Sequence, residues 1–292
     1  MRSLPTPARA AVQHVRARFA VLQGAVGIVG TGRTFGRVAL FVVGSWLVVA
    51  RGVGAVASGF PRRWVVSGPH ISRWARLARR CLGLRVTASG PLPAPGSLVV
   101  ANHQSYADIA VVGGLFAAVY AARHDMRRWP LLGALAASGA TIFINRQNQR
   151  AGVRGVARVA EALAAGATVI AFPEGTTGSG DDLLPLRTGI FQAAVVAGAP
   201  VVPAAVRYRE LDGRPLAPEQ RREVVWYGGV PFAGHARRLI AHRSVGAEVT
   251  LLPALAPPHA DRRTLALQVE QALRGALGYP AAKASGGTEG DD

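Results

Sequence analysis

Short apolar runs, each four to six residues long and rich in valine and isoleucine, recur in the chain from about Leu82 onward. Runs of this length are typical of strands buried on both faces, and the segments between them have helical spacing. The pattern therefore predicts an α/β fold with a mixed, largely parallel sheet flanked by helices. The predicted strands are Ser97–Ala101, Thr141–Ile144, Thr168–Phe172, Val201–Val206, Val224–Tyr227 and Glu248–Leu252.

Helices are predicted at residues 148–165 and 261–277, the second with Asp261 as its N-cap. The first places apolar side chains on one face and an arginine at every fourth position on another. This basic stripe is either a solvated face or a grip for anionic headgroups or for an acidic acyl carrier. Its members are Arg150, Arg154 and Arg158.

The composition indicates one large α/β domain with an appendage. Half of the 292 residues are hydrophobic, which allows a substantial core and excludes a disordered or fibrous protein. We expect a basic and apolar membrane-associating region at 1–73, the α/β domain at 74–279 and a disordered tail at 280–292. Cys81 is the only cysteine, so neither an intrachain disulfide nor a cysteine-based metal site is expected.

The N-terminal region holds an uncharged run, Val38–Ala50, followed by Arg51 and a second apolar stretch, Gly52–Phe60. Thirteen residues rise only about 20 Å as a helix, short of the roughly 30 Å hydrocarbon core of a bilayer. The run therefore lies at the membrane interface, spans the bilayer only if Arg51 snorkels, or forms a buried core helix. Arginines on both sides of the run favour a membrane surface with anionic lipid.

The net charge is strongly positive, at +18 from 34 basic and 16 acidic residues. Such a field attracts a polyanion, either nucleic acid or an anionic membrane surface. The sequence has no basic segment interleaved with stacking aromatic residues and no nucleic-acid-binding motif. Nucleic acid is therefore not expected as a partner.

The first candidate site is the segment Asn-His-Gln-Ser-Tyr-Ala-Asp at 102–108, directly after an apolar run. Residues five apart on a helix point about 140° away from each other, so His103 must precede the helix that carries Asp108. The carboxylate can then fix the imidazole tautomer while the other ring nitrogen takes a proton from a hydroxyl. We expect His103 to be a base supported by Asp108, and Ser105 to stabilise the turn rather than act as a nucleophile.

The second candidate site is the loop Phe-Pro-Glu-Gly-Thr-Thr-Gly-Ser-Gly at 172–180, again directly after an apolar run. Glycine allows close approach to a ligand, and backbone N–H groups in such a turn can hold an anion or a developing oxyanion. Glu174 suits a glycerol hydroxyl or an arginine partner, although the segment is equally consistent with a flexible glycine loop. Guanidinium groups bind phosphate or carboxylate, so Arg146 and Arg187 are candidates unless they are incidental in an arginine-rich chain.

Four motifs occur in a fixed order along the chain. They are Asn102-His103-x4-Asp108, Ile142-Phe143-Ile144-Asn145-Arg146, Phe172-Pro173-Glu174-Gly175-Thr176 and Val202-Pro203-Ala204-Ala205-Val206. This order resembles the four-block pattern of the glycerolipid acyltransferase family, typified by the bacterial 1-acyl-glycerol-3-phosphate acyltransferases. The likeness covers roughly Trp74 to Pro257, and four ordered blocks are far more specific than any one of them.

The resemblance implies an α/β acyltransferase fold with an N-terminal membrane-docking helical region. It implies transfer of a fatty acyl group from an acyl carrier protein or CoA thioester to the hydroxyl of a lysolipid. His103 would be the base and Asp108 its support, while Val202 and Pro203 would shape the acyl side. The residues expected to bind the acceptor are Arg146, Glu174, Gly175, Thr176 and Arg187.

A thioester is already activated, so attack by a deprotonated hydroxyl needs a positioned base and an anion-stabilising turn. Neither a metal, another cofactor nor a covalent intermediate is expected. By the same resemblance, the enzyme would work at the cytoplasmic face of the cell membrane, either peripheral or anchored by a single helix.

The acceptor is open between two lysolipids. Phosphatidate-forming members of the family commonly follow Glu-Gly-Thr with arginine, where this chain has Thr177. The segments around Arg187 and 226–228, with His235 downstream, resemble lyso-ornithine lipid acyltransferases. Because Arg187 can replace the missing cation, 1-acyl-sn-glycerol-3-phosphate is preferred by a narrow margin, giving phosphatidate.

Two other classes of protein are alternatives. One is a non-catalytic, basic membrane-binding protein, and the other is a hydrolase in which His103 activates water. Neither alternative explains four blocks in order.

Overall fold

The structure, a computed structural model, describes residues 32–47, 62–128, 133, 136, 140–145 and 147–281. The expectations for residues 1–31, for 48–61, for Arg146 and for the tail beyond residue 281 lie outside this part of the chain. The predicted boundary between residues 73 and 74 falls within a single helix, α2.

An eight-stranded mixed sheet forms the centre of the molecule, which confirms the predicted α/β fold. Its order is β1-β8-β6-β2-β5-β3-β4, with β7 paired to β6. All pairs are parallel except β6 with β8 and β6 with β7. The strands are β1 (Leu84–Ser89), β2 (Leu98–Ala101), β3 (Val119–Arg123), β4 (Ile142–Ile144), β5 (Val169–Ala171), β6 (Val201–Leu211), β7 (Arg214–Pro215) and β8 (Val245–Leu251).

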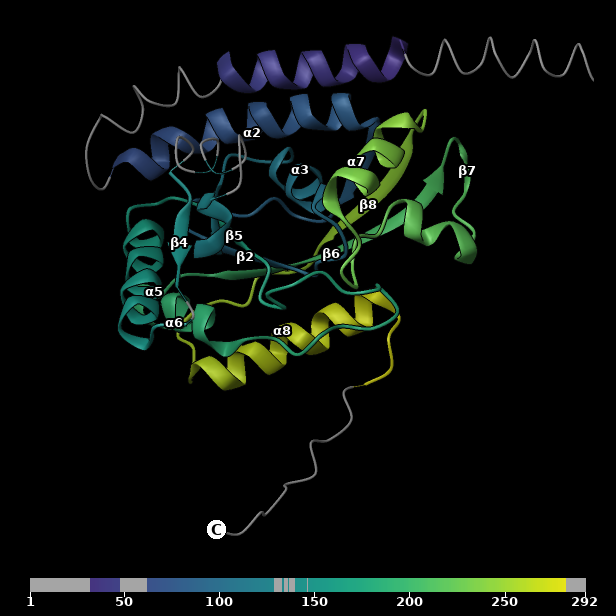
Figure 1. Cartoon of the computed structure of the whole chain (residues 1–292). Coiled ribbons are helices and arrows are strands. Elements are labelled where there is room, and N and C mark those ends of the chain that lie inside the picture. The colour runs from purple at the N-terminus through teal and green to yellow at the C-terminus, as the bar shows by residue number, and fades with distance from the viewer. Residues whose placement is uncertain are drawn as a thin grey trace, which may run out of the picture.

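Helices cover both faces of this sheet (Figure 1). One face carries α2 (Arg62–Leu82), α3 (Ala107–Gly113) and α7 (Phe232–Ala241). The other carries α5 (Gln149–Ala164), α6 (Phe191–Ala197) and α8 (Arg262–Leu277). Asn148 and Asp261 cap α5 and α8 with their side chains, so the two predicted helices and the Asp261 N-cap are confirmed. Three short 3-10 helices are η1 (His124–Arg128), η2 (Thr188–Ile190) and η3 (Pro218–Glu223).

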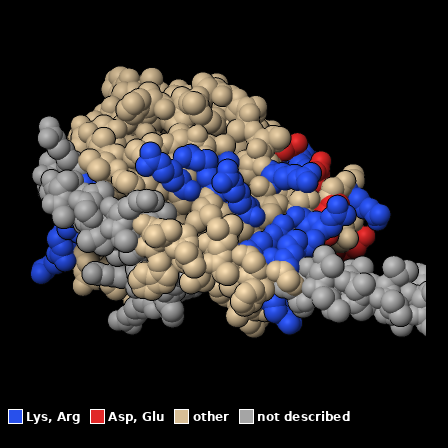
Figure 2. Space-filling view, turned by 90° about the horizontal axis from the view of Figure 1, so that it is seen from above, with Lys and Arg blue, Asp and Glu red and all other residues tan. Residues whose placement is uncertain are grey.

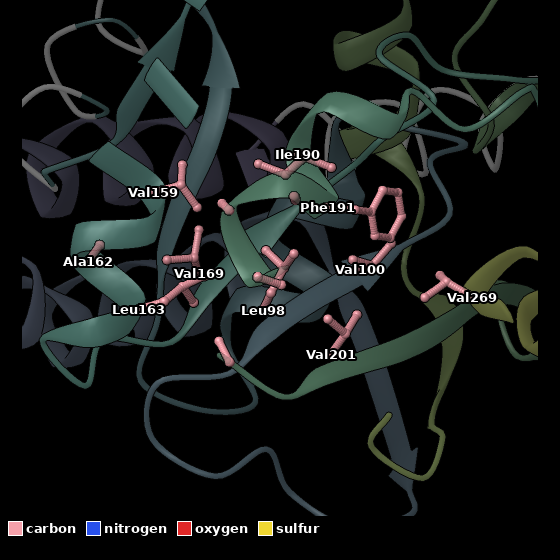
Figure 3. Close-up of a cluster of buried hydrophobic side chains, with 14 of the residues drawn as sticks. Leu98, Val100, Val159, Ala162, Leu163, Val169, Ile190, Phe191, Val201 and Val269 are labelled. Carbon is pink, nitrogen blue, oxygen red and sulfur yellow. The ribbon is translucent and has the colours of Figure 1, made fainter. Parts of the chain in front are cut away.

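Side chains of the central strands alternate between two buried clusters. Leu98 and Val100 of β2 belong to the cluster under α5, α6 and α8, which Figure 3 shows around Phe191. Val99 and Ala101 point to the opposite cluster, under α2 and α3. Because successive strand residues face opposite sides, a run that is apolar throughout is what a sheet covered on both faces requires.

Parallel pairing brings the carboxyl ends of β2, β5, β3 and β4 to one edge of the sheet. The loops that leave these ends carry His103, Glu174 and Asp125. Strand β6 is parallel to β2 but longer, so its second half continues beyond the end of β2. In open α/β sheets this edge is where loops converge to form a site.

Helix α3 is short, and α2 holds its carboxyl-terminal end in place. Arg79 of α2 donates from Nε to the carbonyl of Ala110 at 2.9 Å and from Nη2 to the carbonyl of Val111. Burial lowers the pKa of Arg79 to about 10, which leaves it charged at neutral pH. A cation at this end also interacts favourably with the helix dipole.

Four details of the strands differ from the sequence prediction. Residues 224–227 form no strand; they follow η3 as a loop whose Val224 and Val225 are buried. Burial without sheet pairing explains why this apolar run resembles a strand. Strands β1, β3 and β7 were not predicted, because β1 is largely exposed, β3 (VYAAR) is a short run that ends in arginine, and β7 consists of Arg214 and Pro215 alone.

The helix at residues 32–47 lies over the α2 side of the molecule (Figure 1). It is attached through Arg37, whose guanidinium donates to three carbonyls at the end of α7, and through Ser45, which accepts a hydrogen bond from Trp74 Nε1 at 3.1 Å. Its outer face is exposed and apolar, so it is not a buried core helix. The exposed residues include Phe35, Leu40, Val43, Trp46 and Leu47.

Within the described residues, no helix has both the length and the apolar character needed to cross a bilayer.

Candidate active site

His103 and Asp108 meet in the turn between β2 and α3. His103 Nδ1 lies 2.9 Å from Asp108 Oδ2, and the two side chains are 15% and 0% exposed. His103 lies before the helix and Asp108 in its first turn, as the five-residue spacing predicts. Because Nδ1 faces the carboxylate, Nε2 is the nitrogen left to take a proton from a hydroxyl.

Asp108 is held by four hydrogen-bond donors. Oδ2 accepts from His103 and from the backbone N–H groups of Gln104 and Ser105, at 2.6 and 2.9 Å. Oδ1 accepts from the hydroxyl of Tyr208 at 2.6 Å. A buried carboxylate is tolerated only with such partners, so the turn is built around this group.

The same turn is fixed to β6. Asn102 exchanges two hydrogen bonds with the backbone of Val206, at 3.0 and 2.7 Å, and Gln104 Nε2 donates to the carbonyl of Val206 at 3.0 Å. Ser105 is fully buried, and its hydroxyl accepts from the N–H of Ala107 at 3.3 Å, an arrangement suited to a turn residue. The fourth block therefore reaches the site through Val206.

Glu174 connects the second candidate loop to the first. Its Oε1 accepts from the backbone N–H of His103 at 2.6 Å and its Oε2 from that of Leu184 at 2.9 Å. Burial raises the pKa of Glu174 to about 7, against an ordinary value of 4.5. Both oxygens are occupied by the protein itself, which gives Glu174 a positioning role; contact with the acceptor stays a prediction.

A pocket of about 260 Å³ opens in front of His103. The Phe172 ring stacks on the imidazole with ring centres 4.2 Å apart. Other apolar walls come from Ile71, Trp74 and Ile109. The polar lining includes Tyr106, Tyr120, Arg123, Asp125, Thr176, Thr177 and Trp226.

The predicted acceptor residues are placed unequally. Gly175 and Thr176 line the pocket, and Gly175 has a φ of +75°, which favours glycine. Arg187 is exposed and does not line the pocket; its backbone N–H donates to the carbonyl of Pro173 at 3.0 Å. Arg146 lies outside the described residues. Val202 and Pro203 are buried in β6, paired with β2, and do not line the pocket.

A pair of opposite charges in the pocket lining was not predicted. Arg123 ends β3, and its guanidinium makes two hydrogen bonds to the Asp125 carboxylate, at 3.0 and 2.7 Å. Both side chains are about half exposed, at 52% and 56%. The signal available in the sequence was a charged pair after a short apolar run, which is a weak one because β3 itself was not predicted.

A second cavity, of about 430 Å³, lies next to the first. Trp74, Tyr106 and Ile109 line both cavities, and the second is otherwise mostly apolar. The Tyr106 hydroxyl lies 3.0 Å from Nδ1 of His235, which is buried in α7. Burial lowers the pKa of His235, so this pair is neutral at physiological pH.

Comparisons with known proteins agree with this architecture. The family model described as Acyltransferase matches residues 83–207. The chain is 32% identical over 223 residues to a lyso-ornithine lipid O-acyltransferase of Rhizobium meliloti (strain 1021), covering 73% of this chain and 75% of that protein. It is 33% identical over 200 residues to a 1-acyl-sn-glycerol-3-phosphate acyltransferase of Neisseria gonorrhoeae, covering 68% and 76%.

A solved structure, the 1-acyl-sn-glycerophosphate acyltransferase of Thermotoga maritima, has a similar fold. The TM-score is 0.60, and the match covers 89% of this chain and 98% of that one at 19% identity. Such identity supports the fold alone. The sequence relatives confirm the family that the four ordered blocks indicated: the chain belongs to the acyltransferase family.

Proposed function

We propose that the chain moves a fatty acyl group from an acyl thioester to the hydroxyl of a lysolipid, with His103 as the base. The observation that carries the proposal is the His103–Asp108 hydrogen bond at a pocket whose wall is the loop at 175–177. No serine or cysteine nucleophile is needed, because the acceptor hydroxyl is itself the nucleophile.

The reaction follows from this geometry. His103 Nε2 takes the hydroxyl proton as the hydroxyl oxygen attacks the carbonyl carbon of the thioester. The N–H groups of Gly175 and Gly178 already donate to the carbonyls of Phe172 and His103. The developing oxyanion is therefore assigned to the backbone N–H groups of Thr176 and Thr177, which line the pocket. The carbon–sulfur bond then breaks, the ester remains on the acceptor, and the imidazolium returns its proton to the departing thiolate.

The donor is proposed to be an acyl carrier protein or CoA thioester. The second cavity suits its acyl chain, because it is apolar and shares the walls Trp74, Tyr106 and Ile109 with the pocket of His103. A chain held there has its activated end beside the base.

The acceptor is proposed to be a lyso-ornithine lipid. An ornithine headgroup offers both an ammonium and a carboxylate, which the Asp125 and Arg123 side chains complement. A phosphate dianion at the same place would meet Asp125 as a like charge. Thr177 supplies no cation, and Arg187, which was expected to replace it, lies outside the pocket lining. The Rhizobium relative supports this choice.

1-Acyl-sn-glycerol-3-phosphate is the second candidate, with phosphatidate as its product. The Neisseria relative supports it, and Arg123 can turn toward a phosphate if the ion pair with Asp125 opens. The two candidates differ in headgroup charge, which makes them separable by one assay.

Purified protein is offered a radiolabelled acyl thioester with either lysolipid, and the products are separated. We expect a two-chain ornithine lipid to form roughly twofold to fivefold faster than phosphatidate, because one half-exposed ion pair contributes at most about 1 kcal/mol. Faster formation of phosphatidate would instead identify lysophosphatidate as the acceptor. Vesicle binding without transfer to either acceptor would support a membrane-binding protein and contradict an enzyme.

Peripheral attachment to the cytoplasmic face of the membrane is part of the proposal. The apolar outer face of the 32–47 helix is exposed, and α2 presents Arg73, Arg76 and Arg80 as exposed side chains. Figure 2 looks down on this side of the molecule and shows basic side chains gathered there. Apolar residues that enter the interface beside cations that meet anionic headgroups are typical of a surface-bound protein.

Vesicle sedimentation tests this attachment with two matched variants. Leu47→Ser removes an apolar side chain, 55% exposed, from the proposed docking face, and Leu267→Ser removes one that is 58% exposed from α8 on the opposite face. We expect the first to weaken binding to anionic vesicles roughly fivefold to tenfold, the transfer free energy of one leucine, and the second to leave it unchanged. Equal effects would contradict this orientation.

A further inference from the structure

The side chain that holds the far oxygen of Asp108 comes from a strand outside the catalytic turn. We propose that Tyr208 of β6 is a positioning residue for acyl transfer, which keeps Asp108 Oδ2 directed at His103 by binding Oδ1. The inference rests on the proposed role of His103 as the base. It adds a third member to a hydrogen-bonded chain that runs from β6 through α3 to the pocket.

The two oxygens of Asp108 have different tasks. Oδ2 is shared by three donors, one of which is the imidazole, whereas Oδ1 accepts from Tyr208 at 2.6 Å. The terminal torsion of an aspartate is broad, so the carboxylate plane is not fixed by the side chain itself. The phenol fixes that plane from the side opposite His103.

The position of Tyr208 follows from the length and alternation of β6. Val206 lies just past the end of β2 and binds Asn102 and Gln104 through its backbone. Arg207 points to the other face, where it donates to the carbonyl of Ala276 in α8. Tyr208 is therefore the next residue on the face that carries Asp108.

Tyr208 remains a neutral donor throughout the working pH range. It is buried, and burial raises its pKa well above the ordinary value of 10. Its loss would leave the charge of Asp108 less shared, and the carboxylate would then hold a proton on His103 more strongly. The imidazole would then lose its proton, and act as a base, only at higher pH. Loss of packing alone does not produce this effect.

Other titratable groups lie near Asp108 and Tyr208, and their effects on the pH profile must be distinguished from that of Tyr208. Glu174 accepts from the His103 backbone and has a pKa raised by burial to about 7, and it lies close enough to Asp108 to interact with it. Tyr120 is buried on the α3 side and interacts with Asp108 without a hydrogen bond to it, since its hydroxyl donates to Ile109. Tyr106, on the pocket side, has a pKa raised by burial.

The test compares Tyr208→Phe with Tyr120→Phe, measuring kcat and KM from pH 5.5 to 9 in the full chain. Both variants lose one buried tyrosine hydroxyl, but only the first loses a bond to Asp108. We expect Tyr208→Phe to lower kcat roughly 10- to 100-fold, the range for a hydrogen bond to a charged group, with the acceptor KM within about twofold. The acidic limb of the kcat–pH profile should move to higher pH in Tyr208→Phe and stay in place in Tyr120→Phe.

The same comparison in a Glu174→Gln background removes the titration of that carboxyl from the profile. If Tyr208→Phe fails to fold, 3-fluorotyrosine at position 208 keeps the ring and makes the phenol a stronger donor, so the acidic limb should move to lower pH. An unmoved limb in a folded Tyr208 variant would overturn the inference. Absence of acyl transfer in the unaltered chain would instead overturn the proposed function.

Discussion

The two ends of the pocket are built differently. At one end, Asp108 is fully buried and receives four hydrogen bonds, while His103 is held by Asp108, by Glu174 and by a stacked ring. At the other end, Arg123 and Asp125 are about half exposed and pair mainly with each other. The first is fixed by the fold, whereas the second is free to rearrange around a ligand.

This difference separates chemistry from recognition. A buried network in which each polar group has a partner has one arrangement, since breaking it leaves a charge without compensation. An exposed ion pair contributes little to stability, so its residues can change without loss of the fold. We therefore expect relatives to share the base and to differ in the acceptor.

The largest expected effect is at the buried end. Asp108→Asn should lower kcat by about 10²–10⁴-fold, because an amide cannot hold the imidazole in the required tautomer. It should also lower the free energy of unfolding by about 1–3 kcal/mol, since donors now face an NH₂ group. Steady-state kinetics measure the change in kcat, and chemical denaturation measures the change in the free energy of unfolding. An unchanged kcat would contradict the assignment of the chemistry to the buried end of the pocket.

A second prediction concerns Glu174, which has a folded pKa of about 7 and an ordinary value of 4.5. Its proton is bound more tightly in the folded chain, so the stabilisation is full below pH 4.5 and is lost as pH rises toward 7. Glu174→Gln should remove this fall, which amounts to at most about 3 kcal/mol. Denaturation curves at pH 5 and 7.5 measure this pH dependence of the free energy of unfolding, with Glu270→Gln as the control. The same pH dependence in Glu174→Gln and in the unaltered chain would argue against a buried, protonated Glu174.

The smallest effect is expected at the exposed end. Asp125→Asn should shift the preference between lyso-ornithine lipid and lysophosphatidate roughly twofold to fivefold toward the phosphate, with stability unchanged. Glu248→Gln breaks the similarly exposed pair with Arg209, neither of which lines the pocket, and should leave the preference as it was. Competition between the two lysolipids measures the ratio, and equal ratios in both variants would remove Asp125 from acceptor selection.

Sequence reasoning reached the buried end well. The five-residue spacing of His103 and Asp108 excluded a shared helix, and apolar runs located β2 and β5, whose carboxyl ends carry both motifs. Because β2 and β5 pair in parallel, their carboxyl ends lie side by side, which brings the two motifs together. The helix at 148–165 was also predictable, since its apolar spacing and its Asn148 cap are local features.

The exposed end and the support from β6 were not predictable in the same way. Tyr208 lies 100 residues from Asp108 in sequence, and its contact depends on how far β6 extends past β2. Arg123 and Asp125 follow a strand too short to recognise. Arg187 was expected to bind the acceptor, but it does not line the pocket. No local sequence pattern indicates the course of the loop that carries it.

The most direct test of the account is the rate of acyl transfer to the lysolipid by His103→Ala, measured beside the unaltered chain with one acyl thioester. Because this side chain is the proposed base and forms only one edge of the pocket, we predict a fall of about 10²–10⁴-fold with an almost unchanged melting temperature. A folded His103→Ala protein that transfers acyl groups at the original rate would contradict the account.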